Sequence, residues 1–213
     1  MTDIQDKIRA ALVRPPHVIH LDSFRLAAVA MIFTPGDDLL LMRRATHDKD
    51  PWSGHVSFPG GRREPDDQSA LETATRETME ELGFPLGDSE FVGRIDDLRT
   101  IEPLPPILIQ PHVFFLTEEP TLHLNHEVVS VHRLSIHSLL ANKNRTTMRH
   151  PWRGTPRSFP CVEFDGLCLW GLTLHMVDDL LHRLDQGGRG LQRLPAIPRP
   201  DAFDLQEAAK WER

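Results

Sequence analysis

The stretch that decides most about this chain is residues 71–83, LETATRETMEELG. At about 100° per residue, a helix over these positions has an apolar stripe on one side, formed by Leu71, Ala74, Thr78 and Leu82. Three carboxylates spaced i, i+3 and i+4 gather on the other side: Glu77, Glu80 and Glu81. Gly83 follows as the residue that ends the helix. The stretch therefore predicts a helix with one core-facing side and one acidic side.

The acidic side is a costly arrangement for an isolated helix. Like charges at these spacings destabilise a helix by about 0.2–0.5 kcal/mol per pair, and acids in the last turn meet the unfavourable end of the helix dipole. We therefore expect a positive charge against them. The loop at 57–61, SFPGG, permits close backbone approach, and Asp66 and Asp67 are candidate N-caps. Carboxylates with a backbone carbonyl form a hard oxygen site, which indicates Mg²⁺ or Mn²⁺ and not zinc.

Charge and composition exclude several classes of protein. The 213 residues include 24 Lys and Arg against 31 Asp and Glu, a net charge of −7, so we expect no nucleic-acid binding, which needs clustered basic residues. No apolar run approaches the ~20 residues of a membrane span, and the N-terminus lacks the apolar core of a signal peptide. We therefore expect a cytoplasmic protein. Cys161 and Cys168 are too few for a disulfide framework or a four-cysteine zinc site, and we expect small buried hydrophobes.

Periodicity and turn signals outline a single domain over residues 1–213. Helices are predicted at 3–13, 67–82, 135–140 and 171–184, and strands at 25–34, 39–43, 91–95, 107–116, 128–134, 162–164 and 167–170. A loop is predicted at 45–63, a tight hairpin turn at Asp165 and Gly166, and an ordered arm or loose tail at 187–213. Strands interleaved with helices in this order predict an α/β domain with a mixed sheet.

Residues 60–84 resemble the signature box of the Nudix hydrolase family, G-x5-E-x7-R-E-U-x-E-E-x-G-U, where U is a bulky aliphatic residue. Gly61 matches the first glycine, and residues 76–83, RETMEELG, match the R-E-x-x-E-E-x-G core in full. The interval from Gly61 to Arg76 is one residue longer than in the family, and the acidic position before the helix falls at Asp67 or Gln68. The resemblance implies the Nudix α/β/α sandwich around a central mixed sheet, hydrolysis of a nucleoside diphosphate derivative, and compatibility with a homodimer.

The residues before the box resemble the coenzyme A diphosphatase branch, whose members carry L-L-T-x-R-[SA]-x3-R-x3-G-x3-F-P-G-G. Here residues 40–45, LLMRRA, lead to residues 54–61, GHVSFPGG. Met42 replaces the threonine, and Lys49 stands where the branch has arginine. This resemblance implies that the substrate is coenzyme A or a derivative, cleaved to 3′,5′-ADP and 4′-phosphopantetheine.

The acidic helix supplies the expected metal ligands. They are Glu77, Glu80 and Glu81, with the carbonyl of Gly60 or Gly61 as an auxiliary ligand. We expect Arg76 to hold Glu80 in place through an i,i+4 ion pair. The general base that activates water has two candidates, Glu77 and Glu127, the second in a loop just before a predicted strand.

Four residues are candidates for substrate binding. Arg43 and Arg44 end a predicted strand that we expect to lie near the loop at 57–61, where a guanidinium can bind phosphate through two nitrogens. The alternative for each arginine is a solvated or structural ion pair. Trp52 and Phe58 are candidates for stacking on a base or packing against the pantetheine. The alternative for this aromatic pair is that both side chains anchor the loop.

Two further functions stay open. The first keeps the chemistry and changes the substrate to an NDP-sugar, NADH, ADP-ribose or a dinucleoside polyphosphate. The second is a non-catalytic Nudix-fold sensor that binds a nucleotide, which is disfavoured because all three carboxylates of the box are present.

Overall fold

Two apolar strands form the centre of the molecule, β1 (Arg25–Phe33) and β7 (Ile107–Phe115), which pair in parallel along their whole length. The computed structural model describes residues 3–20, 24–48, 50, 52–100, 104, 106–152 and 155–185. Side chains of β1 alternate between two cores, with Met31 and Phe33 in one and Ala30 and Ile32 in the other. Residues 25–34 form an almost continuous apolar run, which is typical of a strand covered on both faces, and the strand predicted there is confirmed.

The other strands of the main sheet pair antiparallel with their neighbours. The order β3-β2-β1-β7-β5 is extended by β4 on β1, β6 on β7 and β8 on β2. Their bounds are β2 (Asp38–Arg44), β3 (Val56–Ser57), β4 (Gly60–Arg62), β5 (Phe91–Arg94), β6 (Leu98–Arg99) and β8 (Val128–Ser135). One parallel pair among antiparallel pairs makes the sheet mixed, as predicted. Two strands, β3 and β4, lie inside the predicted loop 45–63, because strands of two or three residues are too short to show an alternating pattern.

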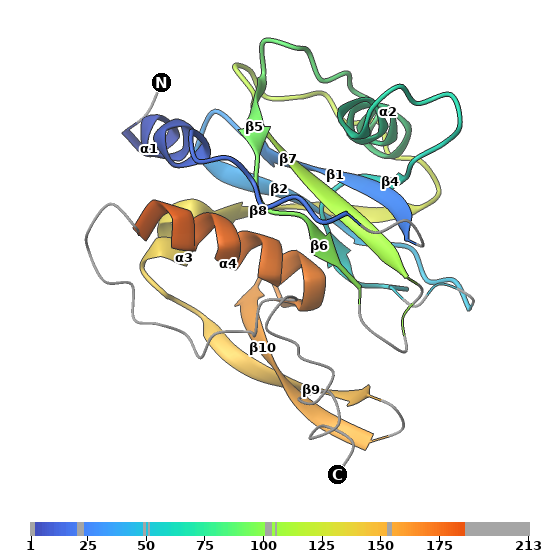
Figure 1. Ribbon diagram of the computed structural model, residues 1–213. Helices are drawn as coiled ribbons and strands as arrows, with labels where there is room; N and C mark the ends of the chain where they lie inside the picture. Colours follow the sequence, from blue (N-terminus) through green and yellow to red (C-terminus); the bar gives the residue numbers. More distant parts are fainter. Residues whose placement is uncertain are drawn as a thin grey trace.

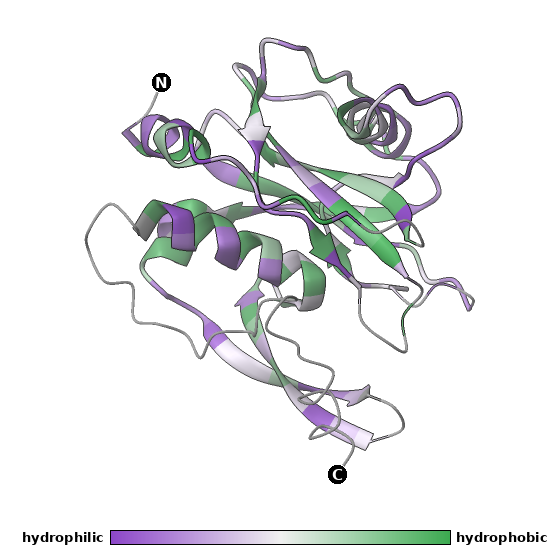
Figure 2. Ribbon diagram, viewed as in Figure 1, coloured by the Kyte–Doolittle hydropathy of each residue, from purple (hydrophilic) through white to green (hydrophobic). Residues whose placement is uncertain are grey.

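Helices cover both faces of this sheet (Figure 1). Helix α2 (Ala70–Leu82) packs on β1 and β4, whereas α1 (Asp3–Leu12) and α4 (Gly171–Asp185) contact each other on the opposite side. The short helix α3 (Ile136–Leu140) follows β8. Hydrophobic residues concentrate in the central strands (Figure 2). The predicted α/β/α sandwich is therefore the observed fold. None of the helices in the described residues is long and apolar enough to cross a membrane.

A second sheet extends from the sandwich and consists of β9 (Arg145–Trp152), β10 (Thr155–Phe164) and β11 (Leu167–Trp170) in the order β11-β10-β9. The predicted turn is present, with φ of 48° at Asp165 and 72° at Gly166, a left-handed pair suited to a two-residue hairpin. The sequence did not indicate β9 or the first part of β10. Their residues are largely polar or proline, so hydrophobic alternation gives no signal there (Figure 2).

Two local predictions need correction. Helix α2 begins at Ala70 and not at 67, because the Ser69 hydroxyl accepts a hydrogen bond from the Glu72 amide at 3.1 Å and caps the helix. Cys161 and Cys168 are not free buried hydrophobes: they form a disulfide across β10 and β11, with Cα atoms 5.9 Å apart. The hairpin register places both on one face of adjacent strands. The arm predicted at 187–213 lies outside the described residues.

Candidate active site

The predicted acidic side of α2 faces the glycine pair at the start of β4. The Glu81 side chain is 2 % exposed, and its Oε2 accepts a hydrogen bond from the Gly60 amide at 2.8 Å. The Glu77 carboxylate lies against Gly61, where an added Cβ would stand 2.3 Å from Oε1. At Gly60, φ is 150° and a Cβ would meet the Ala28 carbonyl oxygen at 2.3 Å. Glycines at both positions therefore allow β1, the loop and two carboxylates to meet at one place.

Burial makes the ionised form of these two carboxylates less favourable. Desolvation raises the pKa of Glu81 to about 8, against the opposing effects of the Gly60 amide and Arg44. Desolvation also raises the pKa of Glu77, although Arg76 acts in the other direction. The negative charge of Glu127 contributes to both increases, so this third acid lies near the pair. Such a group of acids around one buried carboxylate favours a cation beside it.

Arg76 forms hydrogen bonds with two of the acids of α2, Glu77 and Glu80. Its Nη1 donates to both oxygens of Glu80 at 3.1 Å, and the predicted i,i+4 contact is thus present. Its Nη2 donates to Glu77 Oε1 at 3.0 Å. One guanidinium therefore holds two of the three expected metal ligands.

The acid that completes this arrangement is Asp67, and not Gln68. Asp67 is 5 % exposed and accepts hydrogen bonds from Arg76, from the Thr73 hydroxyl at 2.9 Å and from the Glu64 amide at 2.9 Å. The hydrogen bond from Arg76 is the main reason why the pKa of Asp67 falls to about 2. Asp67 was expected as an N-cap, and the structure instead makes it a partner of the arginine.

Arg44 reaches the site from the end of β2. Its Nη1 lies 3.6 Å from Glu81 Oε1, and its Nε and Nη2 donate to Asp50 Oδ2 at 3.2 and 3.1 Å. Arg43, one residue earlier, is exposed and is not brought onto Glu81 in this way. The sequence did not indicate a role for Asp50. An acid six residues after an arginine is the only signal, and it does not distinguish this pair from ordinary loop charges.

The two candidate aromatic residues lie on the core side of their loop. Phe58 is 1 % exposed and belongs to the core cluster beneath the sheet, so its buried ring has no surface to offer a substrate. This corrects its expected place in substrate binding and favours loop anchoring. Trp52 is partly buried and packs against the same core.

The second candidate for the general base, Glu127, is exposed, and its backbone carbonyl accepts a hydrogen bond from the Ala45 amide at 2.7 Å.

The donor set fits a hard divalent cation. Glu77 and Glu81 provide carboxylate oxygens beside the glycine loop, and the Glu80 side chain, 52 % exposed, stands one turn from Arg76. Within the described residues, no three carboxylate, imidazole or thiol groups already converge on one point in the manner of a preformed metal site. Arg76 donates to Glu77 and Glu80, so an ion bound there would share these two carboxylates with the arginine.

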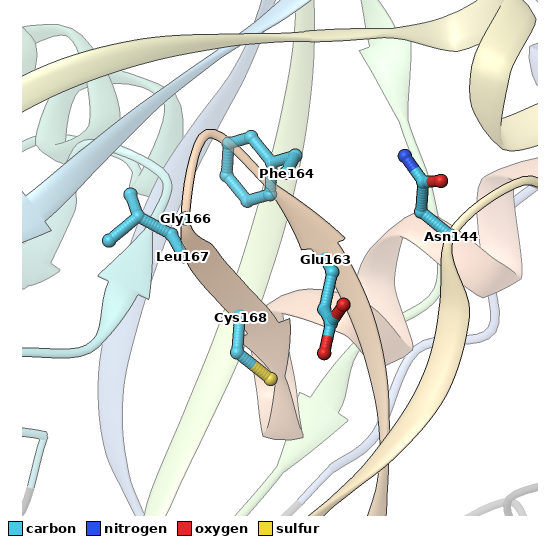
Figure 3. A pocket seen from close by; sticks show the side chains of 6 residues that line it. All are labelled: Asn144, Glu163, Phe164, Gly166, Leu167 and Cys168. Carbon is cyan, nitrogen blue, oxygen red and sulfur yellow. The ribbon is translucent and has the colours of Figure 1, made fainter.

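A separate pocket lies at the second sheet (Figure 3). It has a volume of about 520 Å³ and is lined by Asn144, Glu163, Phe164, Gly166, Leu167 and Cys168. Glu163 is the only carboxylate among these residues, and none of them belongs to the predicted site. The glycine loop and α2, rather than this pocket, form the candidate active site.

Comparisons with known proteins agree with this geometry. The NUDIX domain family matches residues 23–153. An uncharacterized Nudix hydrolase named NudL from Yersinia pestis is 26% identical over 196 residues, which cover 86% of this chain and 94% of that protein. An uncharacterized protein of Schizosaccharomyces pombe is 37% identical over 118 residues, 52% of this chain but only 36% of the yeast protein.

Solved structures share the fold. A MutT protein from Methanosarcina mazei superposes with a TM-score of 0.52 at 17% identity, covering 80% of this chain and 100% of that one. A MutT/nudix family protein from Enterococcus faecalis has a TM-score of 0.53 at 15% identity, covering 100% of this chain and 85% of that one. With the family matched over more than half of the residues and with Glu77 and Glu81 of the box placed on the glycine loop, the chain belongs to the Nudix hydrolases, a family of pyrophosphohydrolases.

Proposed function

We propose that this protein is a divalent-metal-dependent hydrolase that cleaves the diphosphate of coenzyme A or a derivative to 3′,5′-ADP and 4′-phosphopantetheine. The observation that supports it best is the placement of the buried Glu81 and the half-buried Glu77 against the Gly60 and Gly61 loop, with Arg44 3.6 Å from Glu81. Paired buried acids hold a cation, and the neighbouring guanidinium suits a phosphate. The choice of coenzyme A rests on the motif that residues 40–61 share with that branch.

In this proposal, Mg²⁺ or Mn²⁺ is held by Glu77, Glu80 and Glu81 with the Gly61 carbonyl. When bound, such an ion neutralises charge on the diphosphate and lowers the pKa of the attacking water. Arg76 positions Glu80 and Glu77, because it donates to both carboxylates.

Arg44 is the residue best placed to bind a phosphate oxygen, since Asp50 fixes its guanidinium beside Glu81. Arg43 is a second basic group at the same strand end and remains a candidate. Glu77 or Glu127 accepts the proton of the attacking water. The exposed Glu127 can move toward a substrate, whereas Glu77 is held by Arg76.

A second candidate function keeps the hydrolysis and changes the substrate to an NDP-sugar, NADH, ADP-ribose or a dinucleoside polyphosphate. Met42 and Lys49, which depart from the motif of the coenzyme A branch, favour this alternative. The burial of Phe58 removes one of the two aromatic side chains considered for base stacking or pantetheine packing, and it affects both candidates alike. Of that pair, only Trp52 keeps a partly exposed surface.

Incubating the full chain with each compound and Mg²⁺ or Mn²⁺, followed by chromatography of the products, tests both candidates. We expect coenzyme A to give 3′,5′-ADP, and EDTA to stop the reaction. If another nucleoside diphosphate derivative is cleaved faster than coenzyme A, the second candidate function is correct and the first is wrong. Turnover that persists in EDTA, or no cation uptake by calorimetry, would contradict the metal-dependent reaction itself. Light scattering of the same sample tests whether the protein is a homodimer.

A further inference from the structure

Four aromatic rings gather where the second sheet meets the loop before β3. His150 lies on β9, Phe159 on β10, Trp170 at the end of β11, and His55 one residue before β3. Ring centroids are 4.6 Å apart for His150 and Trp170, 4.8 Å for His55 and Trp170, and 5.4 Å for Phe159 and Trp170. We call these four residues the aromatic cluster. Such distances are those of favourable ring contacts.

The aromatic cluster is not needed to fill the core. Val162 and Leu169, which point to the opposite face of β10 and β11, are 2 % and 0 % exposed and pack in the hydrophobic core. All four rings of the cluster are only partly buried. The second sheet therefore uses one face for packing and retains aromatic surface on the other.

The cluster adjoins the candidate active site through Arg44. The Arg44 amide donates to the His55 carbonyl at 3.0 Å, while the Arg44 guanidinium contacts Asp50 and Glu81. Burial lowers the pKa of His55, as do the neighbouring His150 and Arg44, so this ring is neutral at pH 7. A neutral ring loses less hydration than an imidazolium when another ring covers it.

We propose that the aromatic cluster binds the nucleobase of the substrate by stacking, while Arg44 holds the diphosphate beside the carboxylates. This inference rests on the proposed function, because it takes a nucleoside diphosphate derivative as the ligand. A ribose joins base and phosphate in every such molecule, so an aromatic surface next to a phosphate-binding arginine matches the order of its parts. Stacking recognises the face of a ring, so the cluster selects molecules with a base over molecules without one, and distinguishes less between bases.

The test compares two ligands that differ only in the base, AMP and ribose 5-phosphate, each titrated calorimetrically into the full chain with Mn²⁺. We expect AMP to bind at least about tenfold more tightly, since stacking on protein aromatics contributes that much per base. His150→Ala should weaken AMP about fivefold to tenfold and leave ribose 5-phosphate unchanged. Trp170→Leu should act in the same direction.

Ser158→Ala is the matched control, because Ser158 is exposed and precedes Phe159 on the same strand, pointing to the opposite face. It should bind both ligands as the wild type does. Thermal unfolding checks that each variant is folded. Equal binding of AMP and ribose 5-phosphate by the wild type, equal losses for both ligands in His150→Ala, or binding of neither ligand would overturn the proposal.

Steady-state kinetics separate this proposal from the function on which it rests. If the protein hydrolyses a nucleoside diphosphate derivative, His150→Ala should raise KM about fivefold to tenfold with kcat unchanged. Normal hydrolysis with an unchanged KM and unchanged AMP affinity would reject the aromatic cluster and leave the hydrolase intact. A base-dependent affinity without hydrolysis of any diphosphate would reject the proposed function and retain the cluster as a base-binding surface.

Discussion

The Arg76 guanidinium binds the Asp67 carboxylate through two nitrogens, with Nε donating at 3.0 Å and Nη2 at 3.1 Å. The same guanidinium reaches Glu77 and Glu80, so the conformation of two expected metal ligands depends on an acid outside the helix. Asp67 replaces the glutamate that the family box has before the helix. A shorter acid works here because the loop brings its carboxylate within hydrogen-bond distance of Arg76.

Asp67→Asn should destabilise the protein by about 1–3 kcal/mol at pH 7, because a buried charge-assisted hydrogen bond is lost. Urea unfolding measures this change. Asp66→Asn is the control, since Asp66 is exposed and adjacent. The same substitution should reduce kcat by weakening the hold on Glu80 and Glu77. A fully stable Asp67→Asn protein would show that Arg76 is held in place by its other partners alone.

The effect of Asp67 should disappear in acid. The pKa of Asp67 in the folded protein, about 2, lies below its ordinary value of 3.8. The stabilisation is therefore nearly complete above pH ~4 and is lost as pH falls through 2, below which Asp67 is protonated in both states. Unfolding curves of wild type and Asp67→Asn should converge over that range. A difference that stays constant down to pH 2 would contradict this origin.

Gly61→Ala should separate folding from metal binding. Its new methyl group would displace the Glu77 carboxylate, which is the flexible end of a side chain, so the fold should survive with a loss of about 1 kcal/mol. Mn²⁺ affinity and kcat should both fall at least about tenfold, as happens when a ligand is misplaced. Gly87→Ala is the control, because a Cβ there makes only ordinary contact, 3.6 Å from Glu90 Oε2. Wild-type Mn²⁺ affinity in Gly61→Ala would remove Glu77 from the metal site.

Glu81 should make the metal-free protein less stable as pH rises. Its pKa in the folded state is about 8 against an ordinary 4.5, so the folded protein holds a proton that the unfolded chain releases. Stability in EDTA should therefore decline between pH ~4.5 and 8, by on the order of a few kcal/mol. Glu81→Gln should flatten this decline and reduce turnover by orders of magnitude. Glu80→Gln, a 52 % exposed side chain on the same helix, should keep the decline in stability.

Mn²⁺ should reverse that dependence in the wild type, because the ion binds the ionised carboxylates of the folded state only. The shift in unfolding midpoint on adding Mn²⁺ should be larger at pH 8 than at pH 5. An equal shift at both values would show that Glu81 does not contribute to the ion site.

Two variants should identify the general base. Glu127→Gln should lower kcat about 10²-fold or more and leave Mn²⁺ affinity unchanged if Glu127 accepts the proton. Glu77→Gln should weaken Mn²⁺ binding in either case, since Glu77 lies against the metal loop. If kcat persists in Glu127→Gln at saturating Mn²⁺, the proton acceptor is Glu77.

The sequence alone determined an α/β domain with a mixed sheet, a helix ending at Leu82 before Gly83, and the glutamate cluster on that helix, while the start of the helix at Ala70 came from the structure. These features depend on patterns among residues close together in the chain: apolar side chains recur about once per turn in a helix and at every second position in a strand. The contact of Arg76 with Glu80 was predictable for the same reason, as an i,i+4 neighbour.

Only the tertiary structure decided which acid pairs with Arg76, that Asp50 fixes Arg44, that Phe58 is buried, and that β9 completes a second sheet. Each of these features depends on a contact between segments that lie apart in the sequence, and no local sequence pattern indicates which segments meet. Asp67 and Gln68 are equivalent on a sequence basis, and the fold of the loop chooses between them. His55, His150 and Trp170 are brought together from three separate segments, since pairing between distant strands is set by the whole sheet and not by any local pattern.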